Sequence, residues 1–400
     1  MSQVFAIARN TYLQTLRHSL FGVIVLITMG CLAISPAVTG WTLDDDNKML
    51  RDIGLSTLLI QGLFLACLAA SGTISTEIDD KTALTAVAKP VSRFAFVLGK
   101  YLGILLVLAT AHYLAGIAFF MAMRHGVLQT AAETSDLTVI IFGLGVFLLL
   151  IIAATILNYA YEYRFLPTLL TLAVPFLGFS SLVLLVIDRD WKLQTYEVTQ
   201  TMDNLPPEAA DPAAFRGLIS FRPLPGHQQL PGHRGHLVRK IWQGPLSEAD
   251  QRYLENLSPS LQWKKDVGFL AQTARKLQGF EIFKAALLVY GALLVLAGLA
   301  VAVSTRLGMM STFLVCLIVL GAGLSIDQIL HPPPGETVPN WLQQASRLLP
   351  HFQFFWMVDA LSEYRVIPWS YVGHALGYAA LLGLAATFAA AALFETREVG

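Results

Sequence analysis

Eight long apolar runs alternate with polar segments along the chain. Each run has about the 20 residues that an α-helix needs to cross the hydrocarbon core of a bilayer. The runs lie at Ser19–Trp41, Ile53–Ser75, Phe94–Met123, Leu137–Tyr159, Phe165–Ile187, Ala285–Thr305, Leu307–Ile326 and Trp369–Phe394. Because backbone groups in lipid must pair within the protein, each run predicts a helix. The predicted fold class is therefore an all-α polytopic membrane protein with about eight transmembrane helices.

Residues 1–18, before the first run, have the pattern of an amphipathic helix. Apolar Val4, Phe5 and Ala8 recur at helical spacing, while Arg9 and Arg17 fall on other faces. This pattern predicts an elbow helix that lies in the membrane interface before the first span. A cleaved signal peptide also starts with basic residues, but the run that follows here is as long as a full span.

The remaining polar segments divide the chain. Residues 19-187 carry the first five spans with short loops, and they include a polar, helix-compatible segment at 77-93. Residues 188-282 are long enough for an extracytoplasmic domain, which we expect to be α+β or irregular because its middle is rich in Pro, Gly and His. Residues 283-400 carry the last three spans, with an outer loop at 330-368 and a helix from about Leu261 that runs into the sixth span.

Composition supports a membrane protein. Of the 400 residues 55% are hydrophobic and 14% charged, whereas a soluble domain carries about 25% charged residues. The formal net charge is zero, which indicates no nucleic-acid partner and leaves membrane lipid as the expected surroundings. Cys31, Cys67 and Cys316 each fall inside an apolar run. We interpret them as packing residues and not as a disulfide framework.

The short loops favour an orientation with both termini in the cytoplasm, because Lys and Arg concentrate in cytoplasmic loops. With that orientation the cytoplasmic segments carry Arg9, Arg17, Lys81, Lys89, Arg93, Lys100, Arg164, Arg306 and Arg397. The short outer loops then carry only Lys48, Arg51, Arg124, Arg347 and Arg365. The predicted location is the inner (cytoplasmic) membrane.

The segment 77-93 has acidic residues at its start and a basic residue near its end, which suits the helix dipole. Pro90 then stops the helix. Within and just after this segment, Thr82, the run Lys89-Pro90-Val91-Ser92-Arg93 and Gly99-Lys100 resemble the stretch between the second and third spans of ABC-2-type transporter permeases.

That resemblance implies a coupling helix that docks on a separate ABC ATPase subunit. It assigns the coupling role to Glu77, Asp79, Asp80, Thr82, Lys89, Pro90, Ser92 and Arg93. It also implies a homodimer, or a heterodimer with a second permease. The chain departs from the family at Lys81, where Gly is frequent, and this departure concerns the docking contacts.

The chain itself carries no phosphate-binding loop, which requires Gly-x4-Gly-Lys followed by Ser or Thr. No cofactor is therefore expected on it, and ATP would be bound by the partner subunit. His227, His233 and His236 cluster in the outer segment. Their spacing fits no helix-borne metal motif, so we interpret them as a solvated loop rather than a metal site.

Two small-residue spacings, Gly99-x3-Gly103 and Gly373-x3-Gly377, allow helices to approach closely. Packing within the chain and a dimer seam both fit these spacings. Ionisable residues inside the spans are sparse, and His112 and His374 are interpreted as hydrogen-bonded packing residues.

The predicted function is the permease subunit of an ATP-driven ABC transporter, an exporter of lipophilic, amphipathic or large cargo and not an enzyme. The alternative is a membrane scaffold or assembly subunit that binds an extracytoplasmic partner through residues 188-282. A membrane-embedded enzyme is less favoured, because no acidic, His and Cys residues converge at one membrane depth.

Overall fold

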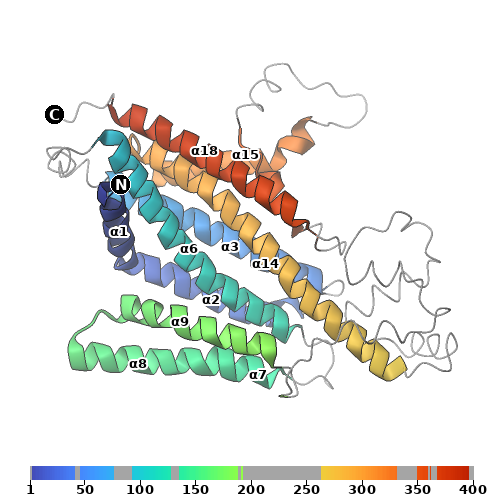
Figure 1. Cartoon of the computed structure of the whole chain (residues 1–400). Helices are drawn as coiled ribbons and strands as arrows, with labels where there is room; N and C mark the ends of the chain where they lie inside the picture. Colours follow the sequence, from blue (N-terminus) through green and yellow to red (C-terminus); the bar gives the residue numbers. More distant parts are fainter. Residues whose placement is uncertain are drawn as a thin grey trace. The chain divides into compact units, whose positions relative to one another are not determined.

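The computed structural model of the chain describes residues 2–40, 46–75, 92–127, 135–187, 191, 263–330, 349–358, 361 and 367–395. These residues form helices and no β-strand (Figure 1). Eight helices in the described ranges are long and apolar enough to cross a membrane, namely Ser19–Thr39, Lys48–Ile74, Arg93–His125, Leu137–Tyr161, Phe165–Val186, Glu281–Ser304, Met309–Ile326 and Trp369–Phe394. The prediction of an all-helical, multi-pass membrane protein is confirmed, with the ends of the spans moved by a few residues.

The helices follow one another with few long connections among the described residues. Their bounds are α1 (Ser2–Leu16), α2 (Ser19–Thr39), α3 (Asp46–Ala70) with the π-turn η1 (Ser71–Ser75), α6 (Arg93–His125), α7 (Leu137–Val139) with the π-turn η2 (Ile140–Gly145), α8 (Val146–Tyr161), α9 (Phe165–Val186), α14 (Trp263–Ser304), α15 (Met309–Leu330), the 3-10 turn η3 (Phe352–Phe355) and α18 (Trp369–Glu395).

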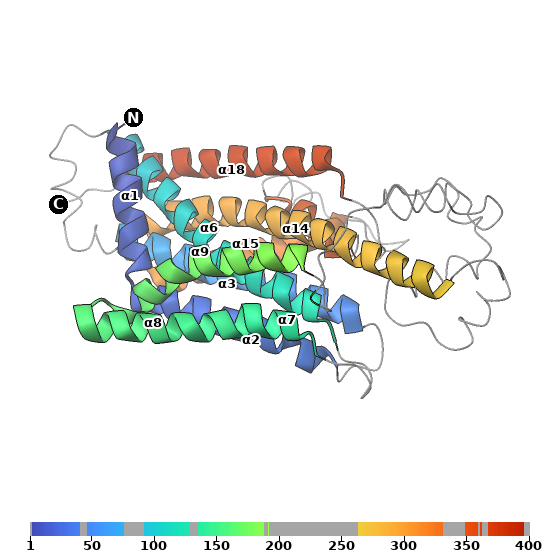
Figure 2. The same ribbon diagram turned by 60° about the horizontal axis from the view of Figure 1, so that its bottom comes forward.

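Helix α6 occupies the middle of the bundle, because it contacts α1, α2, α3, α9 and α18. Figure 2 shows α1 lying transverse to α2 and α6. The side of α1 that packs on the bundle carries Ala8, Thr11 and Thr15, all buried. Phe5, which the sequence pattern placed on the apolar face, is 70% exposed.

Helices α8 and α9 form a hairpin and lie side by side in both views (Figures 1 and 2). The turn between them places Glu162 in the left-handed region, with φ 59°. Leu148, Leu149 and Ile152 on α8 are exposed. An apolar surface of this kind on a membrane-crossing hairpin is suited to contact lipid.

Helix α14 runs without interruption for 42 residues, as predicted for a helix that continues into the sixth span. A tight turn follows, in which the backbone N–H groups of Arg306 and Leu307 both donate to the carbonyl of Val303. Helix α15 then begins at Met309. One basic residue and one glycine are therefore enough to join the sixth span to the seventh.

The chain divides into two compact units. One comprises Met1–Lys192, Ala285–Met357 and Trp369–Gly400, and the other comprises Leu193–Lys284 and Val358–Pro368. Most of the predicted domain at 188–282 lies outside the described residues. The histidines at 227, 233 and 236 lie outside them as well.

Candidate functional site

The predicted coupling residues fall mainly outside the part of the chain that the structure describes. This applies to Glu77, Asp79, Asp80, Thr82, Lys89 and Pro90. Ser92 and Arg93 are described, and they start the third span. Ser92 is the N-cap of α6, and its hydroxyl accepts a hydrogen bond of 3.2 Å from the backbone N–H of Ala95. A cap of this kind satisfies a free donor of the first turn and fixes where the span begins.

A stack of aromatic and cationic side chains connects the start of α6 to the end of α18. The rings of Phe96 and Phe394 are stacked, with centroids 5.9 Å apart. Arg93 lies over the ring of Phe394, with 5.9 Å between its guanidinium carbon and the centroid. Lys100 lies over the ring of Phe96 at 5.4 Å. Both distances are within the range of cation–π attraction.

The stack is embedded in protein. Phe394, Phe96 and Lys100 are all buried, so their attraction is stronger than at an exposed site. A second aromatic contact, Phe94 with Phe388 at 4.6 Å, joins the same two helices. The residues that follow the coupling segment are therefore fastened to the last span.

Arg306, in the turn between α14 and α15, reaches the same place. One of its terminal nitrogens donates a hydrogen bond of 2.9 Å to the carbonyl of Leu393. The last carbonyls of a helix have no partner within the helix, and a cation there also complements the helix dipole. The end of α18 thus joins the start of α6 to the turn after α14. We call this group, Arg93, Phe96, Lys100, Arg306 and Leu393–Phe394, the α18-end cluster.

The transverse helix α1 packs directly beside this cluster. A Cβ atom on Gly99 would lie 2.8 Å from Ile7, and one on Gly103 would lie 2.6 Å from the carbonyl oxygen of Ala8. No side chain larger than hydrogen fits at either position. The Gly99-x3-Gly103 spacing therefore packs α1 against α6 within the chain.

The second spacing, at Gly373 and Gly377, behaves differently. A Cβ atom at either position would meet no described atom within 4 Å. Both residues lie on the exposed side of α18, together with His374. A role of this face in contact with a second permease stays a prediction.

At the opposite ends of the spans, Arg124 joins three of them. It pairs with Asp136 at 3.5 Å and donates to the hydroxyl of Thr138 at 3.1 Å and to the carbonyl of Ile187 at 2.7 Å. Asp136 in turn caps α7 by accepting from the backbone N–H of Thr138 and Val139. The ends of α6, α7 and α9 are fixed to one another by this group.

A short aromatic segment at that end enters the helix bundle. Phe352 and Phe355 of η3 are buried, and the hydroxyl of Tyr371 in α18 donates to the carbonyl of Phe354 at 2.8 Å. Sequence analysis treated this stretch only as part of the outer loop 330–368. The signal that could have found it is the dense aromatic run Phe352–Trp356.

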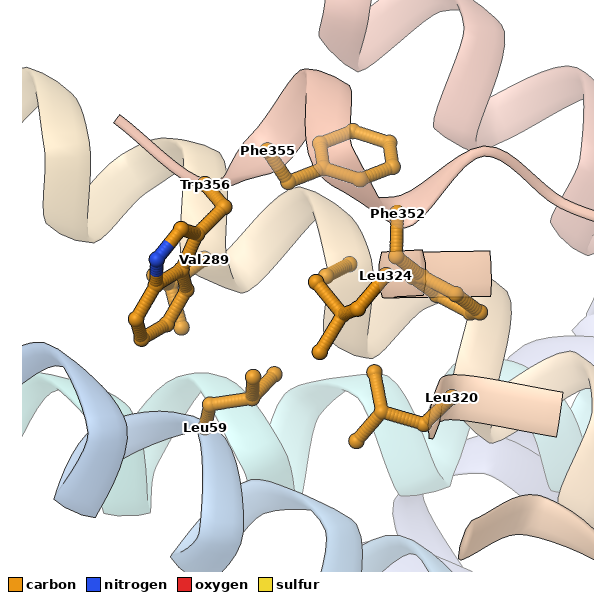
Figure 3. Close-up of a pocket in the computed structure, with 8 residues that line it drawn as sticks. Leu59, Val289, Leu320, Leu324, Phe352, Phe355 and Trp356 are labelled. Carbon is orange, nitrogen blue, oxygen red and sulfur yellow. The ribbon is translucent and has the colours of Figure 1, made fainter. Parts of the chain in front are cut away.

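The segment closes a small apolar pocket, shown in Figure 3. Its lining comes from α3, α14, α15 and η3, namely Leu59, Val289, Ala292, Leu320, Leu324, Phe352, Phe355 and Trp356. The free volume of the pocket is about 10 Å³, which is close to the room that one water needs. Such a crevice is too small to hold cargo.

Among the described residues, no group of three or more His, Cys, Asp or Glu side chains is arranged to hold a metal ion. Comparison of the chain with protein-family models, with curated proteins and with solved structures found no match in any of the three.

Proposed function

We propose that this chain is the membrane-spanning subunit of an ATP-driven transporter of the ABC-2 type. The observation that carries the proposal is the polar segment 77–93 between the second and third spans, with the residues that resemble the family's coupling helix. The chain lacks the phosphate-binding loop, so ATP would be hydrolysed by a partner ATPase. The expected cargo is lipophilic, amphipathic or large, because charged residues inside the spans are few.

The α18-end cluster supports this proposal. A segment that is moved by a partner changes the protein only if it is attached to elements that can move with it. The cluster attaches the residue that follows the segment, Arg93, to Phe394 of the last span and to the turn at Arg306. Movement of the segment would then reach α6, α18 and the α14–α15 turn together.

The test of the proposal is reversal of charge in the segment. We expect Asp80→Lys to reduce the amount of ATPase that co-purifies with the chain, or to separate ATP hydrolysis from transport. Asp45→Lys, in the short loop after the first span, is the matched control and should leave the ATPase bound. Neither change should alter stability by more than about 0.5 kcal/mol if both side chains are exposed. Equal behaviour of the two variants would remove the main support for a coupling helix.

The proposed location is the inner membrane, with both termini in the cytoplasm, and it rests on the distribution of Lys and Arg. Single cysteines at Ser247 and Thr396 test it with a reagent that does not cross membranes. A cysteine at position 247 should react in intact cells, and one at position 396 only after permeabilisation. The opposite result would place the segment 188–282 in the cytoplasm.

A scaffold or assembly subunit is the second candidate, and the long segment at 188–282 favours it. Such a subunit would keep its partner after loss of the ATPase. Deletion of the ATPase separates the two functions, because it should abolish transport but leave a scaffold intact.

A further inference from the structure

Gln61 lies in the middle of the second span, Lys48–Ile74, and only 4% of it is exposed. Neither its amide nitrogen nor its amide oxygen has a hydrogen-bond partner among the described residues. Burial of an amide without partners is unfavourable, and inside a bilayer no bulk water compensates it. An amide in this position therefore needs an explanation beyond packing.

His112, in the third span, has a second polar atom without a partner. Its Nε2 lies 2.8 Å from the carbonyl oxygen of Ala286. Because a carbonyl only accepts, Nε2 is the donor, and Nδ1 of the neutral ring is left as an acceptor. Nδ1 is buried and has no partner among the described residues. The ring is held from the side by Tyr290, with centroids 5.6 Å apart.

The packing of α3 on α6 brings these two residues together. Gly54 of α3 faces the ring of Phe119 of α6 so closely that a Cβ atom on Gly54 would overlap it. Gln61 is seven residues after Gly54, and His112 is seven residues before Phe119. Seven residues make about two turns of a helix, so each returns to the face of its helix that makes the contact.

The two helices are also antiparallel, since they are consecutive membrane spans. Moving along α3 away from Gly54 is therefore the same direction as moving back along α6 from Phe119. Gln61 and His112 consequently lie at one depth, on facing sides of an extended contact between α3 and α6.

We infer that Gln61 and His112 form a binding site for one uncharged hydroxyl group at the middle of the membrane. The site offers a donor and an acceptor from the Gln61 amide and an acceptor from His112 Nδ1. A buried water typically makes about three hydrogen bonds to polar groups that otherwise lack partners. The hydroxyl comes either from a water or from a membrane-soluble alcohol. It joins the second span to the third and, through the other nitrogen of His112, to the sixth.

This inference does not depend on the proposed function, and it is tested on the full chain without any partner. The protein, labelled with ¹⁵N-histidine, is reconstituted into phosphatidylcholine bilayers, whose lipid has no hydroxyl group. Solid-state NMR then measures transfer of proton polarisation from water to His112 Nδ1. The His112→Gln variant assigns the signal, and the signals of the other histidines show whether each variant is folded.

We expect transfer from water to Nδ1 in the wild-type protein and its loss in Gln61→Leu, since that change removes two of the three partners. Gln14→Leu, at an exposed position of α1, is the matched control and should keep the signal. Absence of transfer in the wild type, or equal transfer in wild type and Gln61→Leu, would overturn the inference. Should Gln61→Leu not fold, exchange of the Gln61 side-chain amide hydrogens with D₂O in the wild type gives the same decision.

A second arm identifies the source of the hydroxyl. Addition of 1-decanol to the bilayer should remove the water signal if the site accepts membrane-soluble alcohols. A signal that persists at saturating 1-decanol assigns the site to water.

Discussion

A buried ion pair gives the sharpest quantitative prediction. Lys284 donates from Nζ to Glu281 Oε1 at 2.6 Å and to the carbonyl of Ile367 at 2.9 Å. The backbone N–H of Ile367 donates to the other carboxylate oxygen of Glu281 at 2.8 Å. Both side chains are almost fully buried, with 8% of Lys284 and 7% of Glu281 exposed. Each charge therefore depends on the other for compensation.

Removal of one charge should destabilise the protein strongly. Glu281→Gln keeps a carbonyl that accepts from Ile367 but leaves the ammonium of Lys284 buried without a counter-charge, and Lys284→Met leaves the carboxylate in the same state. Each change should lower the free energy of unfolding by about 3–5 kcal/mol. The double variant buries no charge, retains the bond to Ile367 and should lose only about 1–3 kcal/mol, the value of a hydrogen bond that involves a charged group.

The assay is reversible unfolding in mixed micelles of SDS and a non-ionic detergent, followed by tryptophan fluorescence. The coupling energy is the difference between the double variant and the sum of the two single variants. Arg164→Met, at an exposed turn, is the control and should change stability by less than about 0.5 kcal/mol. Additive losses, or single losses below about 1 kcal/mol, would refute the assignment of a buried, mutually compensated pair.

Two further predictions test the packing of the helices. Gly103→Val should displace α1 and lower thermal stability, because its Cβ would meet the carbonyl of Ala8 at 2.6 Å, whereas Gly116→Val on the same helix has no described atom within 4 Å. Equal melting temperatures of these two variants would contradict the close contact. The thiols of Cys67 and Cys316 lie within hydrogen-bonding reach of each other. Mild oxidation with iodine should therefore cross-link them within one chain, and digestion followed by mass spectrometry should find that bond and no bond to Cys31.

The number and limits of the membrane-crossing helices followed from the sequence alone. Length and hydropathy of a run are local properties, and in lipid a long apolar run has only the helix available to it. The turn at Arg306 and the continuous helix into the sixth span were predicted in the same way, from the absence of any helix-breaking stretch.

The faces on which the helices meet were decided only by the tertiary structure. A membrane helix is apolar on all sides, so the pattern does not distinguish the side that contacts lipid from the side that contacts protein. Phe5 was therefore assigned to the packed side of α1, although it is Ala8 that fits against Gly103. The two glycine spacings looked equivalent in the sequence, yet only the one on α6 meets another described helix.

The candidate site shows the same division. Sequence analysis singled out Arg93 as the end of the coupling segment, but its contact with Phe394 joins residues about three hundred positions apart. Gln61 and His112 are single polar residues in separate apolar runs, and only the register set by Gly54 and Phe119 brings them to one depth. Local sequence determines that a helix crosses the membrane, whereas contacts between distant residues depend on side-chain shape and register, which only the folded bundle defines.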